Sequence, residues 1–185
     1  TFIIPVDGSF NNSGLFTNAL VNASFTNYSA NFNNYGTIDI SYGVFSNSGD
    51  INLKTIYTGS QSVLNIYENG IFENHNNLYL SSIPNNPTEV NINNYSTNFT
   101  NNGLINYTNY GDGHSNINNK SNAKIYNNKK IGDDEHHLYI NNSGIIYNLK
   151  GIGSDRYLTN YETGTIYNGS ETTTYSNINI GSSGG

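Results

Sequence analysis

The chain has 185 residues, of which 11% are charged, and its formal net charge is −6. This acidic balance argues against nucleic acid as a partner, because nucleic-acid binding requires a basic face. No stretch approaches the ~18 consecutive apolar residues that span a membrane, so we expect no membrane insertion. The chain has no Cys and therefore forms no disulfides, and Asn makes up roughly a fifth of it, far above average usage.

The chain begins with an apolar run at residues 1–6, whose candidate contact residues are Phe2, Ile3, Ile4 and Val6. This run either folds over the core of its own chain as a capping strand or pairs with the next subunit by strand addition. The chain also begins with Thr and contains no Met. We therefore expect either a mature form after removal of a secretion signal or a fragment of a longer protein.

The front half of the chain, at residues 1–80, carries a loose repeat. Its phrases begin at Gly14, Gly36, Gly43 and Gly70, with Phe or Ile two residues later, and their spacings are irregular. Residues 81–90 contain two of the three Pro residues. Because strand interiors avoid Pro, we predict an inserted loop at 81–90.

From residue 91 to 180 the repeat becomes regular, and residues 181–185 form a Gly/Ser tail. The phrase is a small residue, any residue, Ile, any residue and then Asn in most copies. Its anchors are Gly103, Ala123, Gly144 and Gly164, which fall 20, 21 and 20 residues apart. A period of this length suits one turn, or rung, of a β-solenoid. We predict one all-β domain over residues 1–185, a right-handed parallel β-helix of about seven or eight rungs of ~20 residues.

Alternation within each phrase predicts which side chains face inward. The predicted core column consists of Ile105, Ile125, Ile146 and Ile166. Two positions further along are Tyr107, Asn127, Asn148 and Asn168, also in the inward phase. Buried amides need partners, so we expect the stacked Asn side chains to hydrogen-bond to one another along the axis. Gly at the anchor fits a corner with positive φ.

The outward phase predicts a row of Tyr126, Tyr147 and Tyr167, with Asn106 as the earlier member of the same column. Such a row is either an ordinary exposed strand face or a platform for sugars or a neighbouring fibre. Asn106 also lies in an Asn-x-Thr sequon and is the best candidate for glycosylation if the protein is secreted where such sites are used.

One charged cluster, at residues 132–137, contains Asp134, and Asp155 has the same phase one rung later. Stacked carboxylates of this kind either bind Ca²⁺ or act as an acid/base pair on a sugar. The third interpretation is that these Asp residues belong to solvated Gly-Asp turns and bind nothing. In a strand, the adjacent His136 and His137 would point to opposite faces. They could not easily bind the same metal ion, which argues against a zinc site. No other cofactor is expected.

The Gly-x-Ile-x-Asn phrase on its short period resembles the parallel β-helices of filamentous haemagglutinin and adhesin-like surface proteins. This resemblance implies a secreted, elongated, non-enzymatic protein at a cell or particle surface. A solenoid exposes an unpaired strand edge at each end, which favours head-to-tail homopolymers. We therefore expect a structural subunit of an extracellular fibre. The alternatives are an adhesin stalk or a polysaccharide-binding module that uses the Tyr row, and a β-helical carbohydrate enzyme that uses Asp134 and Asp155.

Overall fold

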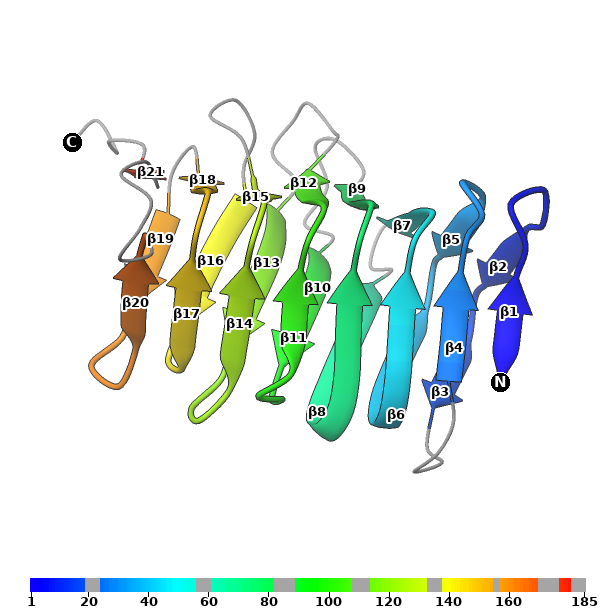
Figure 1. Ribbon diagram of the computed structural model, residues 1–185, viewed down its shortest axis with the longest axis horizontal. Coiled ribbons are helices and arrows are strands. Elements are labelled where there is room, and N and C mark those ends of the chain that lie inside the picture. The colour runs from blue at the N-terminus through cyan, green and yellow to red at the C-terminus, as the bar shows by residue number, and fades with distance from the viewer. Residues whose placement is uncertain are drawn as a thin grey trace.

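The computed structural model describes residues 1–18, 24–55, 61–81, 89–107, 114–132, 138–154, 157–169 and 177–180. Within these ranges all regular structure is β-strand, and every strand pair is parallel. The strands stack along one axis into three faces (Figure 1). The long strands β6 and β8 bend around one corner, which joins the first and second faces into one continuous sheet.

The first face contains β3 (Leu15–Asn18), the first part of β6 (Thr37–Asn47), the first part of β8 (Ser62–Asn74), β10 (Glu89–Asn94), β13 (His114–Asn119), β16 (Leu138–Asn142) and β19 (Tyr157–Asn160). The second face contains β1 (Phe2–Ile4), β4 (Ser24–Asn27), the later parts of β6 and β8, β11 (Phe99–Asn101), β14 (Lys124–Asn127), β17 (Ile145–Asn148) and β20 (Thr165–Asn168). The third face contains eight described strands in chain order, one at each level: β2 (Phe10–Asn12), β5 (Phe32–Asn34), β7 (Asp50–Lys54), β9 (Asn77–Ser81), β12 (Leu104–Tyr107), β15 (Lys130–Ile131), β18 (Gly151–Ser154) and β21 (Asn177–Ile180).

The all-β parallel solenoid predicted from the repeat is confirmed. In Figure 1 the chain runs upward along the second face, crosses the third face at the top and returns behind along the first face. It advances from right to left as it does so, and this combination makes the solenoid right-handed. Of the predicted loop at 81–90, the flanking positions lie in strands instead, because Ser81 ends β9 and Glu89 begins β10. Its remaining residues, 82–88, and the predicted tail at 181–185 lie outside the described ranges.

The inward side chains of each face form columns along the axis that fill the core. On the second face the column changes from Phe to Ile along the axis: Phe2, Phe25, Phe45, Phe72, Phe99, Ile125, Ile146 and Ile166. Consecutive Phe rings in this column contact each other, with 5.2 Å between the ring centroids of Phe72 and Phe99. The interior of this column is fully buried, since Phe45, Phe72 and Phe99 are each 0% exposed.

The predicted alignment of Ile105 with Ile125, Ile146 and Ile166 is wrong at its first member. Ile105 lies in β12 on the third face, where it pairs with Leu78 and Ile131. The residue that pairs with Ile125 is Phe99, 26 positions earlier. The same phrase therefore occurs on two different faces, and the 20-residue step from Gly103 to Ala123 is not one rung. For the same reason Tyr107 and Asn106 do not belong to the columns predicted for them.

The inward Asn residues of the second face form a hydrogen-bonded series, which we call the inner asparagine ladder. Each Nδ2 donates to the Oδ1 of the next member at 2.7–2.8 Å, and the members are Asn27, Asn47, Asn74, Asn101, Asn127, Asn148 and Asn168. Most of these Asn side chains also form hydrogen bonds with backbone groups at the corner between the second and third faces. Asn101 Oδ1, for example, accepts from the N–H of Gly103 at 3.3 Å, and its Nδ2 donates to the carbonyl of Lys130 at 3.2 Å. The predicted pairing of Asn127, Asn148 and Asn168 is confirmed, and it satisfies polar groups that burial would otherwise penalise.

The sequence predicted positive φ at the anchor glycines, but the structure gives a different reason for glycine at these positions. Among the described residues, positive φ occurs only at Gly43, Gly132, Gly169 and Asn122. At the anchors the backbone of one rung instead presses against the backbone of the rung before it. A Cβ on Gly103 would meet the carbonyl of Asn76, and a Cβ on Gly144 would meet the carbonyl of Ala123. Glycine is required at these corners because two main chains approach closely there.

The asparagine columns allow a matched test of burial. Asn94 is 0% exposed and bonds Asn119, Lys124 and Ser96, whereas its neighbour Asn93 faces outward and bonds Asn65 and Asn118. We expect Asn94→Ala to lower the free energy of unfolding by about 3 kcal/mol, because it leaves buried polar groups unpaired. Asn93→Ala should cost less than about 1 kcal/mol, since water replaces the lost bonds. Chemical denaturation measures both, and equal losses would contradict this account.

A second test uses two glycines at the same corner of successive rungs. A Cβ on Gly36 would fall on the backbone of Ser13 and Gly14, whereas a Cβ on Gly14 has nothing within 4 Å. Gly36→Ala should therefore destabilise the protein by about 2 kcal/mol through overpacking. Gly14→Ala should leave the thermal unfolding temperature unchanged. A similar loss in both variants would show that backbone conformation, rather than contact between rungs, selects glycine here.

Candidate functional site

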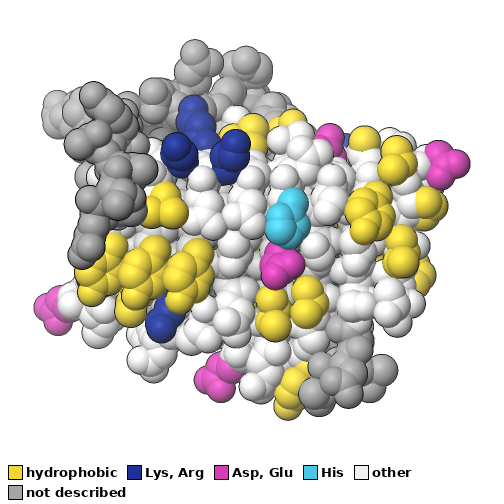
Figure 2. Space-filling model, viewed as in Figure 1, with side chains coloured by type: hydrophobic (Ala, Val, Ile, Leu, Met, Phe, Trp, Pro, Cys, Tyr) yellow, Lys and Arg dark blue, Asp and Glu magenta, His cyan; other side chains and the backbone are white. Residues whose placement is uncertain are grey.

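The outer surface of the second face carries the tyrosine row, which consists of Tyr126, Tyr147 and Tyr167. Their ring centroids lie 5.0 and 5.1 Å apart with interplanar angles of 7° and 9°, so the three rings are stacked. The spacing matches the ~4.8 Å between paired strands, because each ring belongs to the next rung. Figure 2 shows this row as three adjacent yellow side chains along the face. The residue that pairs with Tyr126 on its other side is Thr100, not Asn106.

The stacking determines what the tyrosine row can offer a ligand. The rings of Tyr126 and Tyr147 cover each other's faces, so the row does not present two flat rings side by side. A sugar that stacks on an aromatic side chain needs an open ring face. The row instead presents ring edges and one phenol hydroxyl per rung, and each hydroxyl both donates and accepts hydrogen bonds.

Beside the tyrosine row, at the corner between the second and third faces, lies a groove of about 460 Å³. We call it the lysine groove, and it is lined by His75, Asn76, Asn102, Gly103, Leu104, Lys129, Lys130 and Lys150. The chain has only seven Lys and Arg residues, and three of them gather here. Figure 2 shows Lys side chains grouped together above the tyrosine row.

Sequence reasoning missed the lysine groove, although a signal for it was present. The pattern Tyr-Asn-x-Lys occurs at residues 126–129 and again at 147–150. Since Tyr126 pairs with Tyr147, each rung places its Lys at the same distance beyond the ring. The phrase that defines the repeat ends at its Asn, so it does not include the Lys at the following corner.

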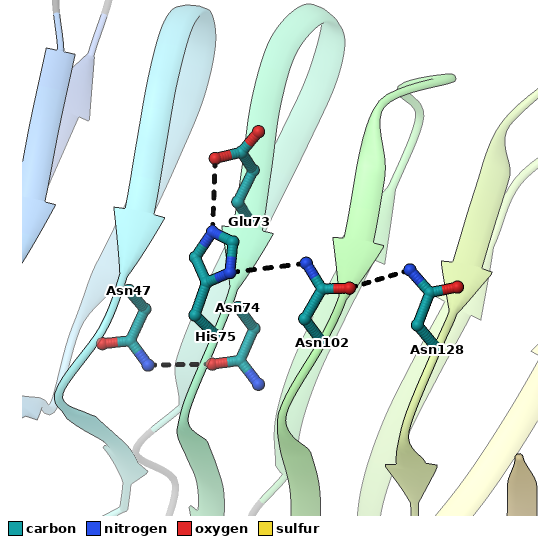
Figure 3. Close-up of polar contacts among 6 residues, drawn as sticks. All are labelled: Asn47, Glu73, Asn74, His75, Asn102 and Asn128. Carbon is teal, nitrogen blue, oxygen red and sulfur yellow. Dashed lines mark hydrogen bonds and ion pairs between the residues drawn. The ribbon is translucent and has the colours of Figure 1, made fainter.

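Hydrogen bonds hold one end of the lysine groove in place (Figure 3). Asn128 Nδ2 donates to Asn102 Oδ1 at 2.8 Å, and Asn102 Nδ2 lies 3.4 Å from His75 Nδ1. The opposite ring nitrogen of His75, Nε2, lies 3.4 Å from the Glu73 carboxylate. The contacts through Asn102 run along the axis between neighbouring rungs, and the contact with Glu73 lies along the strand (Figure 3). Together they orient the His75 ring.

A second groove of about 520 Å³ lies at the corner between the first and second faces. Tyr67 and Tyr95 stack there with 5.6 Å between ring centroids, and Glu68 and Tyr42 also line it. The Nζ of Lys120 lies 6.0 Å from the centroid of the Tyr95 ring. Burial raises the pKa of the Tyr67 phenol, and the nearby Asp39 carboxylate and Tyr95 phenol raise it further. The irregular spacing of the front half concealed this site.

The N-terminal end of the solenoid exposes part of the core. Phe2 occupies the inward phase of β1 and stacks on Phe25 at 5.2 Å, yet it is 52% exposed whereas Phe25 is 2% exposed. The next inward residue of β1, Ile4, is 3% exposed. Ile3 and Val6 are 56% and 74% exposed. The predicted assembly residues thus divide into one that is buried and three that remain accessible.

Two other predicted sites, the carboxylate pair and the glycosylation site, remain predictions. Asp134 and Asp155 lie outside the described residues, as do His136 and His137. Asn106 is half-buried on the third face, in β12, and its side chain accepts from the N–H of Tyr107 at 2.9 Å. Within the described part of the chain, no group of three or more His, Asp or Glu side chains could hold a metal ion.

Among the described residues there is no helix long and apolar enough to cross a bilayer. Comparisons with protein-family models, curated proteins and solved structures found no match. The evidence for function therefore comes from the surfaces described above.

Proposed function

We propose that this protein is a non-enzymatic structural subunit that assembles head-to-tail into an extracellular fibre. The observation that carries the proposal is the exposed aromatic end of the second-face column. Phe2 occupies a core position, yet about half of its surface is exposed because no described rung covers it. In a solenoid, the partner with a matching surface is another rung of the same kind.

The opposite end of the chain offers such a rung. Ile166 and Leu158 continue the core columns in the last described rung and are only partly buried. In the proposed contact, β1 of one copy pairs with β20 of the next, which places Phe2 beside Ile166. The same operation places β2 on β21. The first face has seven described strands against eight on each of the other two faces, so β3 and β19 do not meet in this contact. A contact between two different ends of one chain repeats without closing, so it produces a filament.

Phe2 provides a specific test of this contact. About half of Phe2 is exposed in the single chain, whereas in the proposed contact it lies against Ile166 of the next copy. A charge at this position would be buried without a partner in the filament and solvated in the monomer. We expect wild-type protein to form filaments in electron micrographs, with a sedimentation coefficient that rises with concentration. Phe2→Asp should remain folded and monomeric.

Lys54→Ala is the control for this experiment, because Lys54 lies on the third face away from both ends. It should form filaments as the wild type does. A wild-type protein that stays monomeric at high concentration would refute the proposal, as would normal filaments from Phe2→Asp.

A second candidate function is glycan binding at the tyrosine row, as an adhesin stalk or a polysaccharide-binding module. The observation that favours it is the regular line of phenol hydroxyls, one for each rung. Because the rings cover each other, we expect the hydroxyls rather than the ring faces to contact sugar.

Tyr147→Phe separates these two modes of contact, because it keeps the stacked ring and removes only the hydroxyl. On a glycan array, Tyr147→Phe should bind several-fold more weakly than the wild type, consistent with the loss of one hydrogen bond. Tyr79→Phe, on the third face, should bind as the wild type does. Unchanged binding by Tyr147→Phe combined with loss in Tyr147→Ala would instead favour contact through the ring.

A further inference from the structure

We propose that the lysine groove binds an anionic polysaccharide that lies along the solenoid axis. The proposal is independent of filament formation, since the groove lies on the side of a single chain. It also differs from the tyrosine row in the chemistry that it uses, which is charge rather than the phenol hydroxyl.

The first argument is the concentration of positive charge in the groove. Lys129, Lys130 and Lys150 are all exposed, and no carboxylate among the described residues forms an ion pair with them. Lys129 and Lys150 belong to successive rungs, since the N–H of Gly151 donates to the carbonyl of Lys129 at 3.2 Å. Like charges on adjacent strands repel each other, and a bound anion relieves that repulsion. This concentration of positive charge occurs in a chain whose net charge is −6.

The second argument is the shape of the groove. Its lining residues lie at or just before the starts of four successive third-face strands, β9, β12, β15 and β18. Three strand spacings make the groove roughly 14 Å long, parallel to the axis. An extended polymer fits this shape better than a compact ligand does. Asn76 and Asn102 add amides to the groove. Asn76 already donates to Asp50, and Asn102 already contacts His75 and Asn128, but each amide retains capacity for a further hydrogen bond to a sugar hydroxyl.

The third argument concerns which polyanion fits. Double-stranded DNA carries one negative charge per about 1.7 Å and binds through many phosphate contacts to a basic face. Here three Lys residues occupy two neighbouring rungs about 4.8 Å apart, and the rest of the chain is acidic. A polysaccharide with about one sulfate or carboxylate per sugar ring has a charge spacing closer to that of the rungs. Its neutral hydroxyls also suit the amides of the groove.

The experiment compares two double variants that remove the same charge. Lys129→Gln/Lys150→Gln removes two charges from the lysine groove, and Lys54→Gln/Lys120→Gln removes two charges outside it. Binding is measured at fixed ionic strength by calorimetry with dextran sulfate, polygalacturonate, neutral dextran and a double-stranded DNA fragment. Thermal unfolding of both variants verifies that they are folded.

We expect the wild type to bind at least one of the two anionic polysaccharides and not neutral dextran. The comparison of sulfate with carboxylate identifies the anionic group that the groove prefers. The groove variant should bind roughly tenfold more weakly, since each exposed charge contact contributes a factor of a few, while the control variant binds as the wild type does. Equal losses in both variants, no binding to either polysaccharide, or tighter binding to DNA than to both would overturn the proposal.

Discussion

The structure depends on the contact between one rung and the next at the spacing of paired strands. At that spacing every inward side chain must be compatible with the residue of the same phase in the neighbouring rung. Aromatic and aliphatic residues meet this requirement by packing, and Asn meets it because an amide both donates and accepts. The inner asparagine ladder therefore stabilises the corners without leaving buried polar groups unpaired. The same close approach explains why Gly103 and Gly144 have no room for a side chain.

The same alignment arranges the outer surface. A residue type that recurs at one outward position becomes a row along the axis, as with Tyr126, Tyr147 and Tyr167. Repetition at a corner has a similar effect on charge, and it brings Lys129 and Lys150 into one groove. In a chain with few charged residues, such an arrangement concentrates charge that would otherwise be dispersed.

The ends and the sides of the solenoid suit different roles. The ends present unfinished core columns and strand edges, which suit the proposed contact with another copy of the chain. The sides present hydroxyls, amides and ammonium groups, which match polar polymers. Assembly through the ends leaves the sides accessible and repeats the lysine groove along the filament. A repeated site of this kind would bind a long polyanion more tightly than one copy does, because later contacts are intramolecular.

Period and alternation in the sequence were enough to predict a parallel β-solenoid, the inward Asn residues and the stacked tyrosines. These features depend on local phase, which can be read without knowing how the chain turns. The tertiary structure alone decided which phrases stack on which. The phrase at Gly103 has the same pattern as that at Ala123 but lies on another face, because every face imposes the same alternation. The lysine groove and the exposed Phe2 also required the fold, since both depend on which rungs are neighbours and where the stack ends.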